Sequence, residues 1–429
     1  MRDLFVTLVV LGMLPAVLFQ PWIGVMLWSW IGYMNPHRLA YGFAADFPFA
    51  MLIALFTMVG LLFSKEDKKI PWTRETVILA VFIFWMFITS IFAIHESLAW
   101  AQFEKVIKIQ VMTFITLMIM GSQKRLVYLV WIIVLSLGFY GIKGGIFTIL
   151  TGGGFRVQGP YGTFIGGNNE IGLALIMIIP LMRFLQMQAQ QWYVRYGMTV
   201  AMLLTFVAVL GTQSRGALVG VVAMTVFMIM KSRKKFLFLL LIVAATPIAF
   251  NFMPQSWHDR MGTIETYEED KSAMERIDAW KFAFNTALKR PLNGGGFETF
   301  SGRTEAHSIY FEVLGEHGFV GLGLFLSLAF LTWFSGSWVA KQTRKNEQLK
   351  WCYDLVTMLQ VSLIGYAVSG AFLGLAYFDL FYHLIAMMVL TKVFVIKYLA
   401  DNEGKTEISA GESDKKPRVR SYGVVDFDR

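Results

Sequence analysis

The 429-residue chain has few of the residues on which soluble, redox-active and zinc-binding proteins depend. Charged residues make up only 16% of it and hydrophobic residues 56%, against about 25% and 45–50% in soluble globular domains. The single cysteine, Cys352, excludes an intrachain disulfide, a cysteine zinc cluster and a thiol redox pair. The composition therefore excludes a soluble cytosolic protein and indicates a polytopic membrane protein.

Several signatures of phosphate, acyl-transfer and metal chemistry are also missing. The sequence contains no G-x-x-x-x-G-K-[ST] phosphate loop and no G-x-S-x-G nucleophile elbow. The acidic run Glu268-Glu269-Asp270 has adjacent rather than convergent carboxylates, which favours a solvated loop over a metal site. We therefore expect no metal and no cofactor. The net charge of +9 suits cytoplasmic loops of a membrane protein, so we expect no nucleic-acid partner.

Long apolar runs recur along the chain without the alternation of barrel strands, so they predict an all-α fold. We expect about twelve transmembrane helices. The runs lie at 4–34, 48–63, 76–94, 105–120, 126–148, 169–185, 196–211, 214–230, 236–250, 309–338, 352–376 and 377–400.

Basic residues punctuate alternate connections, which predicts that these connections face the cytoplasm. The expected cytoplasmic residues are Lys65, Lys68, Lys69, Arg74, Lys124, Arg125, Arg183, Arg195, Lys231, Arg233, Lys234, Lys235, Lys341, Arg344, Lys345 and Lys350. Residues 1–250 then form an N-terminal transmembrane bundle, 251–308 a long helical periplasmic loop, 309–400 the last transmembrane helices and 401–429 a disordered cytoplasmic tail.

The first apolar run is the weakest part of this topology. Charge parity favours one pass through 4–34, broken near Pro15 and Pro21, with the N-terminus in the cytoplasm. Its 31 residues would make about 46 Å of straight helix, too long for a hydrocarbon core of about 30 Å unless it is kinked or tilted. Two short helices with the N-terminus outside are the alternative.

Two arginines lie at predicted outer helix starts, where backbone amides can bind phosphate oxygens. Arg215 follows Ser214, a candidate helix cap, in the short turn GTQSRG. Arg156 lies between Gly152-Gly153-Gly154 and the next outward helix start. A guanidinium beside such a terminus suits a diphosphate, although an arginine that only anchors a helix end has the same local pattern.

Two histidines compete for a catalytic role at the start of the helix after the long loop. His307 lies at the helix opening, where the positive helix end favours the neutral ring that a general base needs. His317 lies about 15 Å further along the helix, at 1.5 Å per residue. We expect His317, Glu312 and Glu316 to be structural or supporting groups.

The segment Met274–Leu288 predicts an amphipathic helix on the outer membrane surface. Its apolar positions are Ile277, Trp280, Ala283, Phe284 and Leu288. Pro291 ends the helix, and a glycine turn over 293–296 is expected to let backbone approach a ligand. A helix that merely covers the bundle, with Arg276 reaching lipid headgroups, is equally compatible with this pattern.

These motifs resemble the O-antigen ligase and polymerase superfamily of bacterial envelope enzymes. The resemblance rests on GTQSRGALVG at 211–220, ERIDAWKFAFNTALKRPLNGGGFETF at 275–300 and HSIYFEVLGEHGFVGLGLFL at 307–326. The segment PWIGVMLWSWIGYMNPHRLAYGF at 21–43 is similar to O-glycosylation ligases associated with exosortase A systems.

The resemblance implies a metal-independent inner-membrane glycosyltransferase that moves a glycan from undecaprenyl diphosphate to a lipid or protein hydroxyl at the periplasmic face. By motif, Arg215 and Arg276 match the diphosphate-binding arginines and His307 the essential histidine, whereas Arg156 has a weaker match. Many members have asparagine where this chain has Ser308. A glycan polymerase of the same superfamily and a lipid-linked glycan transporter stay open as alternatives, as do the glycan, the acceptor and the oligomeric state.

Overall fold

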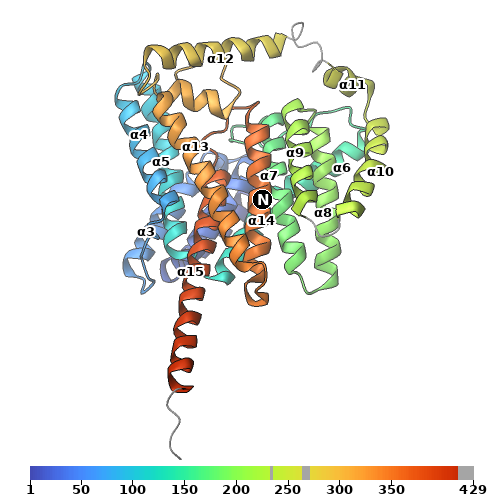
Figure 1. Cartoon of the computed structure of the whole chain (residues 1–429). Coiled ribbons are helices and arrows are strands. Elements are labelled where there is room, and N and C mark those ends of the chain that lie inside the picture. Colours follow the sequence, from blue (N-terminus) through green and yellow to red (C-terminus); the bar gives the residue numbers. More distant parts are fainter. Residues whose placement is uncertain (232–234, 263–270, 414–429) are drawn as a thin grey trace, which may run out of the picture.

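The protein is an all-helical bundle covered at one end by crosswise helices (Figure 1). The structure, a computed structural model, describes residues 1–231, 235–262 and 271–413, and no strand occurs in them. The helices are α1 (Arg2–Phe19), α2 (Pro21–Met34), η1 (Pro36–Leu39), η2 (Phe43–Ala45), α3 (Phe49–Phe63), α4 (Arg74–Ile91), α5 (Glu96–Ile119), α6 (Gln123–Leu150), α7 (Asn168–Gln188), α8 (Trp192–Gly211), α9 (Arg215–Lys231), α10 (Lys235–Phe252), α11 (Gln255–Gly262), α12 (Lys271–Lys289), α13 (Ile309–Thr343), η3 (Glu347–Leu349), α14 (Lys350–Gly370) and α15 (Asp379–Ser413). The predicted all-α fold is confirmed.

Eight helices of the described residues are long and apolar enough to cross a membrane. They are α1, α4, α6, α7, α8, α13, α14 and the first part of α15. The expected count of about twelve is not confirmed. Helices α2, α3 and α9 have only 14, 15 and 17 residues, and α5 carries Glu104, Lys105 and Lys108 within its length.

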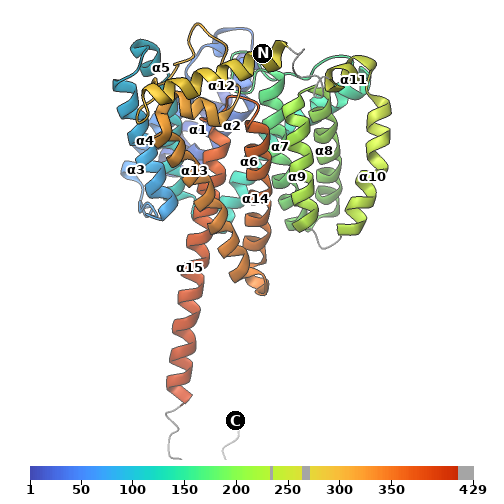
Figure 2. The same cartoon turned by 45° about the horizontal axis from the view of Figure 1, so that its top comes forward.

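The connections divide between two ends of the bundle. One end, here called the α12 end, carries α11 and α12 and the start of α13 (Figures 1 and 2). The opposite end, here called the basic end, carries the connections that follow α3, α5, α7, α9 and α13. Most of the lysines and arginines expected in the cytoplasm lie in or beside these connections. The alternation that predicted the topology is thus reproduced, and the side of the membrane that each end faces stays a prediction.

The first apolar run is two antiparallel helices, which corrects the preferred single pass. Pro21 opens α2 directly after the non-helical residue Gln20. The Asp3 carboxylate accepts hydrogen bonds from the backbone amides of Gly42 and Ala44, at 3.0 and 3.2 Å. The start of α1 therefore lies beside the connection that follows α2. Because the chain reverses at Pro21 instead of continuing across, the N-terminus lies on the same side of the bundle as the connection that follows α2.

Helix α13 is bent at Gly318, whose φ of 68° interrupts an otherwise helical run. The bend lies against the turn that follows α12, where the amide of Phe319 donates to Pro291 O at 2.9 Å. The amides of Gly295 and Gly296 donate to the carbonyls of Gly315 and Glu316, each at 2.8 Å. The glycine turn therefore packs on α13 rather than opening toward a ligand, which differs from the expectation for 293–296.

The start of the expected tail also differs from the sequence expectation. Helix α15 continues to Ser413, so residues 401–413 are helical rather than irregular. The run DNEGKTEISAGES contains no proline to stop the helix. Residues 414–429 lie outside the described residues.

A buried ion pair joins three helices near the basic end. Lys392 of α15 lies 3.1 Å from the Glu75 carboxylate of α4, and Glu75 is 1% exposed. Ser335 of α13 donates a hydrogen bond to the same carboxylate and accepts one from Lys392 at 2.8 Å. This pair fixes α4, α13 and α15 relative to one another.

Candidate active site

The N-termini of α7 and α9 meet at the α12 end, and the end of α14 at Gly370 and Phe372 links α9 to the start of α13. A Cβ placed on Gly172 of α7 would lie 2.9 Å from the Ala217 side chain of α9. A Cβ on Gly216 of α9 would lie 2.9 Å from Phe372, and one on Gly370 would lie 2.7 Å from Ile309 at the start of α13. Such close approach needs glycine. The positive N-terminal ends of α7, α9 and α13 make this region favourable for an anion.

The turn between α8 and α9 holds Arg215 at this junction. Ser214 caps α9 by accepting a hydrogen bond from the amide of Ala217 at 3.2 Å, so the predicted cap is confirmed. Arg215 is the first residue of α9 and is half-buried. The backbone carbonyl of Thr212 accepts from the Asn168 side chain at 2.9 Å, which ties the start of α7 to the same turn.

Arg156 is connected to this turn through Gln213. Its Nε lies 3.4 Å from the Gln213 side-chain oxygen, and the Gln213 amide donates to Gly153 O at 3.0 Å. The Arg156 side chain itself is exposed. The structure thus connects Arg156 to the turn that holds Arg215, with Gln213 as the link between them.

Helix α12 docks on the residues that precede α13. The Trp280 indole N–H donates to Ala306 O at 2.8 Å, and the Trp280 ring stacks on Phe311 with centroids 5.1 Å apart. Arg276 lies one helical turn before Trp280 and is therefore on the same side of α12. The docked Trp280 places Arg276 near the residue that follows Ala306.

The buried face of α12 differs from the predicted apolar face. Its buried residues are small, namely Ala279, Ala283, Thr286 and Ala287. Phe284 and Leu288, expected on the apolar face, are 46% and 58% exposed. The helix packs on α13 through its small residues, because these let the two backbones approach closely.

His307 is the residue that Trp280 and Arg276 flank. It has a left-handed backbone with a φ of 45°, and it directly precedes Ser308, the N-cap residue of α13. Burial, followed by the positive charge of Arg276, lowers the pKa of His307, whereas Glu305 and Glu275 act in the opposite direction. The ring is therefore neutral at pH 7, mainly because of burial rather than because of the helix end alone.

Two carboxylates of the site, Glu170 and Glu305, were missed by sequence reasoning. Glu170, in the first turn of α7, lies within electrostatic range of Arg276 and of Glu305. Its signal in the sequence, an acidic residue in the first turn of a helix, is common and is usually read as a stabilising contact with the helix end. The tertiary arrangement of the helices brings Glu170 toward Arg276 of α12.

His317 has a structural environment, as the sequence analysis expects. It is 0% exposed, and its ring lies within 2.6 Å of the Thr89 hydroxyl. Its backbone carbonyl accepts from the Trp85 indole at 3.0 Å. The rings of Phe297 and Tyr377 pack edge-on against it. His317 is thus enclosed, whereas His307 lies within electrostatic range of Arg276.

A small cavity of about 170 Å³ adjoins His307 through Glu305 and Ala306. Glu316 accepts hydrogen bonds from the Glu298 amide at 2.9 Å and from the Tyr377 hydroxyl at 2.6 Å. The lining combines carboxylates with aromatic rings and contains Gln102, Phe164, Glu298, Phe300, Glu305, Ala306, Glu312, Glu316, Gly374, Leu375, Tyr377 and Phe378. Among the residues that the structure describes, no group of three or more His, Cys, Asp or Glu side chains is arranged to hold a metal ion.

Residues 200–326 match the O-antigen ligase family (Wzy_C). The match covers Arg215, Arg276 and His307 and supports the O-antigen ligase and polymerase type of membrane glycosyltransferase. Residues 1–190 match a family of unknown function (DUF5935). No curated protein matches the chain.

Residues from both matched regions of the chain contribute to the candidate site. Arg156 and Glu170 belong to the N-terminal match, whereas Arg215, Arg276 and His307 belong to the O-antigen ligase match. The network through Gln213 and the contact of Gly172 with α9 join the two parts. The site therefore depends on both parts of the chain.

Proposed function

We propose that the protein transfers a glycan from undecaprenyl diphosphate to an acceptor hydroxyl, without a metal ion, at the periplasmic face of the inner membrane. The observation that carries this proposal is the pair of Arg276 and the neutral His307, which the Trp280 contact holds together. A cation for the departing diphosphate and a base for the acceptor proton are the two groups that this reaction needs.

The arginines and helix ends suit the donor. A diphosphate is a good leaving group once its developing negative charge is stabilised, and guanidinium groups and helix amides stabilise such charge. We assign this role to Arg215 and Arg276, with Arg156 as a further contact. The polyprenyl tail would lie between transmembrane helices, so the diphosphate would meet the arginines at the membrane surface.

His307 is assigned as the general base. Its neutral ring accepts the proton of the acceptor hydroxyl while that oxygen attacks the anomeric carbon. The bond from the anomeric carbon to the diphosphate oxygen breaks, and its electron pair leaves with the diphosphate. A single displacement of this kind inverts the configuration at the anomeric carbon.

The acidic cavity beside His307 suits a sugar rather than the diphosphate. Its described lining contains Glu298, Glu305, Glu312 and Glu316 and no lysine or arginine. Carboxyl groups form hydrogen bonds with the hydroxyl groups of a sugar, and the described lining offers no cation to a phosphate. We therefore place a sugar unit in this cavity and assign the charged part of the donor to the arginines.

The test measures donor binding and product formation on the same purified, reconstituted variants. His307→Ala should lose about 10²–10⁴-fold in rate, the usual contribution of a general base, with donor binding retained. His258→Ala is the matched control, since His258 is a half-buried histidine of α11 whose ring bonds to Met253 O at 3.1 Å. Near-normal transfer by folded His307→Ala, or a product that retains the anomeric configuration, would contradict the assignment.

The same assay separates ligase from polymerase. The O-antigen ligase family match fits both activities, which share a donor and differ in the acceptor. Lipid-core, peptide and undecaprenyl-diphosphate glycan acceptors should be supplied separately and the conjugates identified by mass spectrometry. A conjugate formed only on a second lipid-linked glycan would assign the polymerase. Transport of donor across vesicles with no conjugate on any acceptor would favour the transporter.

A further inference from the structure

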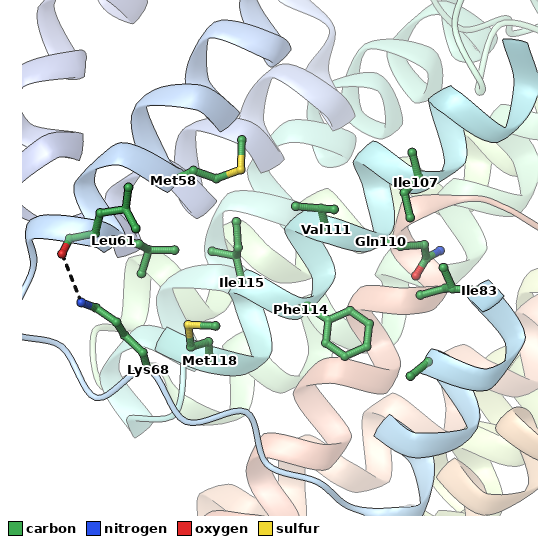
Figure 3. Close-up of a pocket in the computed structure, with 12 residues that line it drawn as sticks. Met58, Leu61, Lys68, Ile83, Ile107, Gln110, Val111, Phe114, Ile115 and Met118 are labelled. Carbon is green, nitrogen blue, oxygen red and sulfur yellow. Dashed lines mark hydrogen bonds between the residues drawn. The ribbon is translucent and has the colours of Figure 1, made fainter. Parts of the chain in front are cut away.

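A second, larger cavity lies toward the opposite end of the bundle, between α3, α4 and α5 (Figure 3). Its volume is about 550 Å³. The lining is almost entirely apolar and consists of Met58, Leu61, Leu62, Lys68, Ala80, Ile83, Ile107, Gln110, Val111, Phe114, Ile115 and Met118. The last residues of α3, the middle of α4 and the second half of α5 form it, and the ends of α3 and α5 place it in the half of the bundle near the basic end.

The cavity exists because α3 does not pack closely on α4 and α5. Helix α3 packs on α1 and α2, whereas α4 packs on α5 and α13. Met58, Leu62 and Val111 of the wall are 40%, 75% and 38% exposed, so the cavity is an open groove on the side of the bundle.

A groove of this kind selects a lipid chain. A cavity of about 550 Å³ has room for many water molecules, each of which needs two to four polar partners, yet only two side chains of the described wall, Lys68 and Gln110, are polar. At the depth of a bilayer core, the surrounding medium supplies hydrocarbon chains. An acyl chain is therefore the occupant that fills the groove without exposing apolar surface to water.

The residues at the rim of the groove favour an anionic lipid headgroup. Lys68 lies at its mouth, with Nζ 3.4 Å from Leu62 O, as Figure 3 shows. The acidic residues nearest in the chain are already paired, since Glu66 lies 2.6 Å from Arg125 and Asp67 lies 3.8 Å from Lys69. The positive charge of Lys68 is thus not offset by either of these carboxylates.

Trp72 marks this rim as a membrane interface. It is 65% exposed, and its ring lies 6.5 Å from that of Phe114, a residue of the groove wall. Tryptophan is enriched where the headgroup region meets the hydrocarbon core, and a lysine at this depth attracts anionic lipid by about 1 kcal/mol.

We propose that this groove binds one acyl chain of an anionic glycerophospholipid, with the lipid phosphate at Lys68. The site is independent of the proposed transferase function, because Arg215, Arg276 and His307 lie at the α12 end of the bundle. A polyprenyl diphosphate bound at those arginines would have its charged group at the wrong end for this groove.

The test measures lipid retained by the full-length protein in native mass spectrometry. The detergent-purified protein is given equal amounts of phosphatidylglycerol and phosphatidylcholine of the same chain length. We expect more phosphatidylglycerol to be retained. Lys68→Gln should lower its retention about fivefold, which corresponds to about 1 kcal/mol. Val111→Trp, which fills the groove, should lower the retention of both lipids.

Two matched controls separate the groove from general effects of charge and bulk. Lys345→Gln removes an exposed lysine from another connection at the basic end, and Val77→Trp adds the same bulk at an exposed position of α4 outside the groove. Both should retain lipid as the unchanged protein does.

Three results would overturn the proposal. Equal retention of the two lipids would show that the groove does not select an anionic headgroup. If Lys345→Gln and Val77→Trp lost as much lipid as Lys68→Gln and Val111→Trp, lipid would not bind specifically in the groove. Displacement of phosphatidylglycerol by inorganic phosphate alone, or by a lower concentration of undecaprenyl phosphate, would assign the groove to a different occupant.

Discussion

Replacing Trp280 by phenylalanine or alanine separates the two contacts that hold α12 over His307. Phenylalanine keeps an aromatic ring on Phe311 but loses the 2.8 Å hydrogen bond from the indole to Ala306 O. That bond contributes about 1 kcal/mol net. Alanine loses the stacked pair as well, which adds about 1 kcal/mol beyond the lost apolar contact, so the total is roughly 2–3 kcal/mol.

These free energies set upper limits on the change in rate, because one factor of ten corresponds to about 1.4 kcal/mol. Trp280→Phe should slow glycan transfer by up to about fivefold and Trp280→Ala by up to roughly 30–150-fold. The loss arises because α12 no longer holds Arg276 beside His307. Amide hydrogen exchange should rise over residues 273–289 and 301–308 in Trp280→Ala and much less in Trp280→Phe.

Transfer rates and exchange are measured on the same reconstituted proteins, with Leu288→Ala as the control. Leu288 is 58% exposed on α12. Its replacement therefore changes the same helix but leaves the contacts of Trp280 intact. Folded Trp280→Ala that transfers glycan within twofold of the unchanged protein would refute the reasoning. Equal losses in the phenylalanine and alanine variants would assign the whole effect to the hydrogen bond.

Three further predictions concern protonation and stability. The positive charge of Arg276 lowers the pKa of His307 and Glu305 raises it, so Arg276→Gln should move the acid limb of the pH–rate profile to higher pH. Glu305→Gln should move this limb to lower pH, and shifts of the same sign in both variants would contradict the arrangement. Lys392→Met leaves the Glu75 carboxylate buried without its ion pair and should destabilise the protein by about 3 kcal/mol. Thermal unfolding in detergent measures this, and most of the loss should be recovered when Glu75→Leu is added.

The helices and some of their ends could be read from the sequence. Long apolar runs and sparse charge give an all-helical membrane protein, because only helices or closed barrels satisfy the backbone in lipid. Ser214 before an apolar run gave the cap of α9, and the apolar run at 309–338 gave the start of α13. These features depend on neighbours within one turn of helix, so the local sequence contains them.

The sequence also identified the candidate catalytic and binding residues, but it did not show which of them lie close together. Arg215, Arg276 and His307 stood in motifs, and their roles stay predictions. Glu170 had no motif, and the structure brings it near Arg276, more than one hundred residues away. His317 and His307 looked alike by type, and burial against Thr89 and Phe297 separates them.

The sequence by itself determined which segments are helical and which connections carry positive charge. Tertiary structure decided the direction of the first helix, the bend at Gly318, the meeting of α7 and α9, and the link from α9 through the end of α14 to the start of α13. Apolar patterning reports only that a helix is buried or in lipid, and every transmembrane helix shares that pattern. The neighbours of each helix are chosen by close contacts at small residues such as Gly172, Gly216 and Gly370, which exist only once the helices have come together.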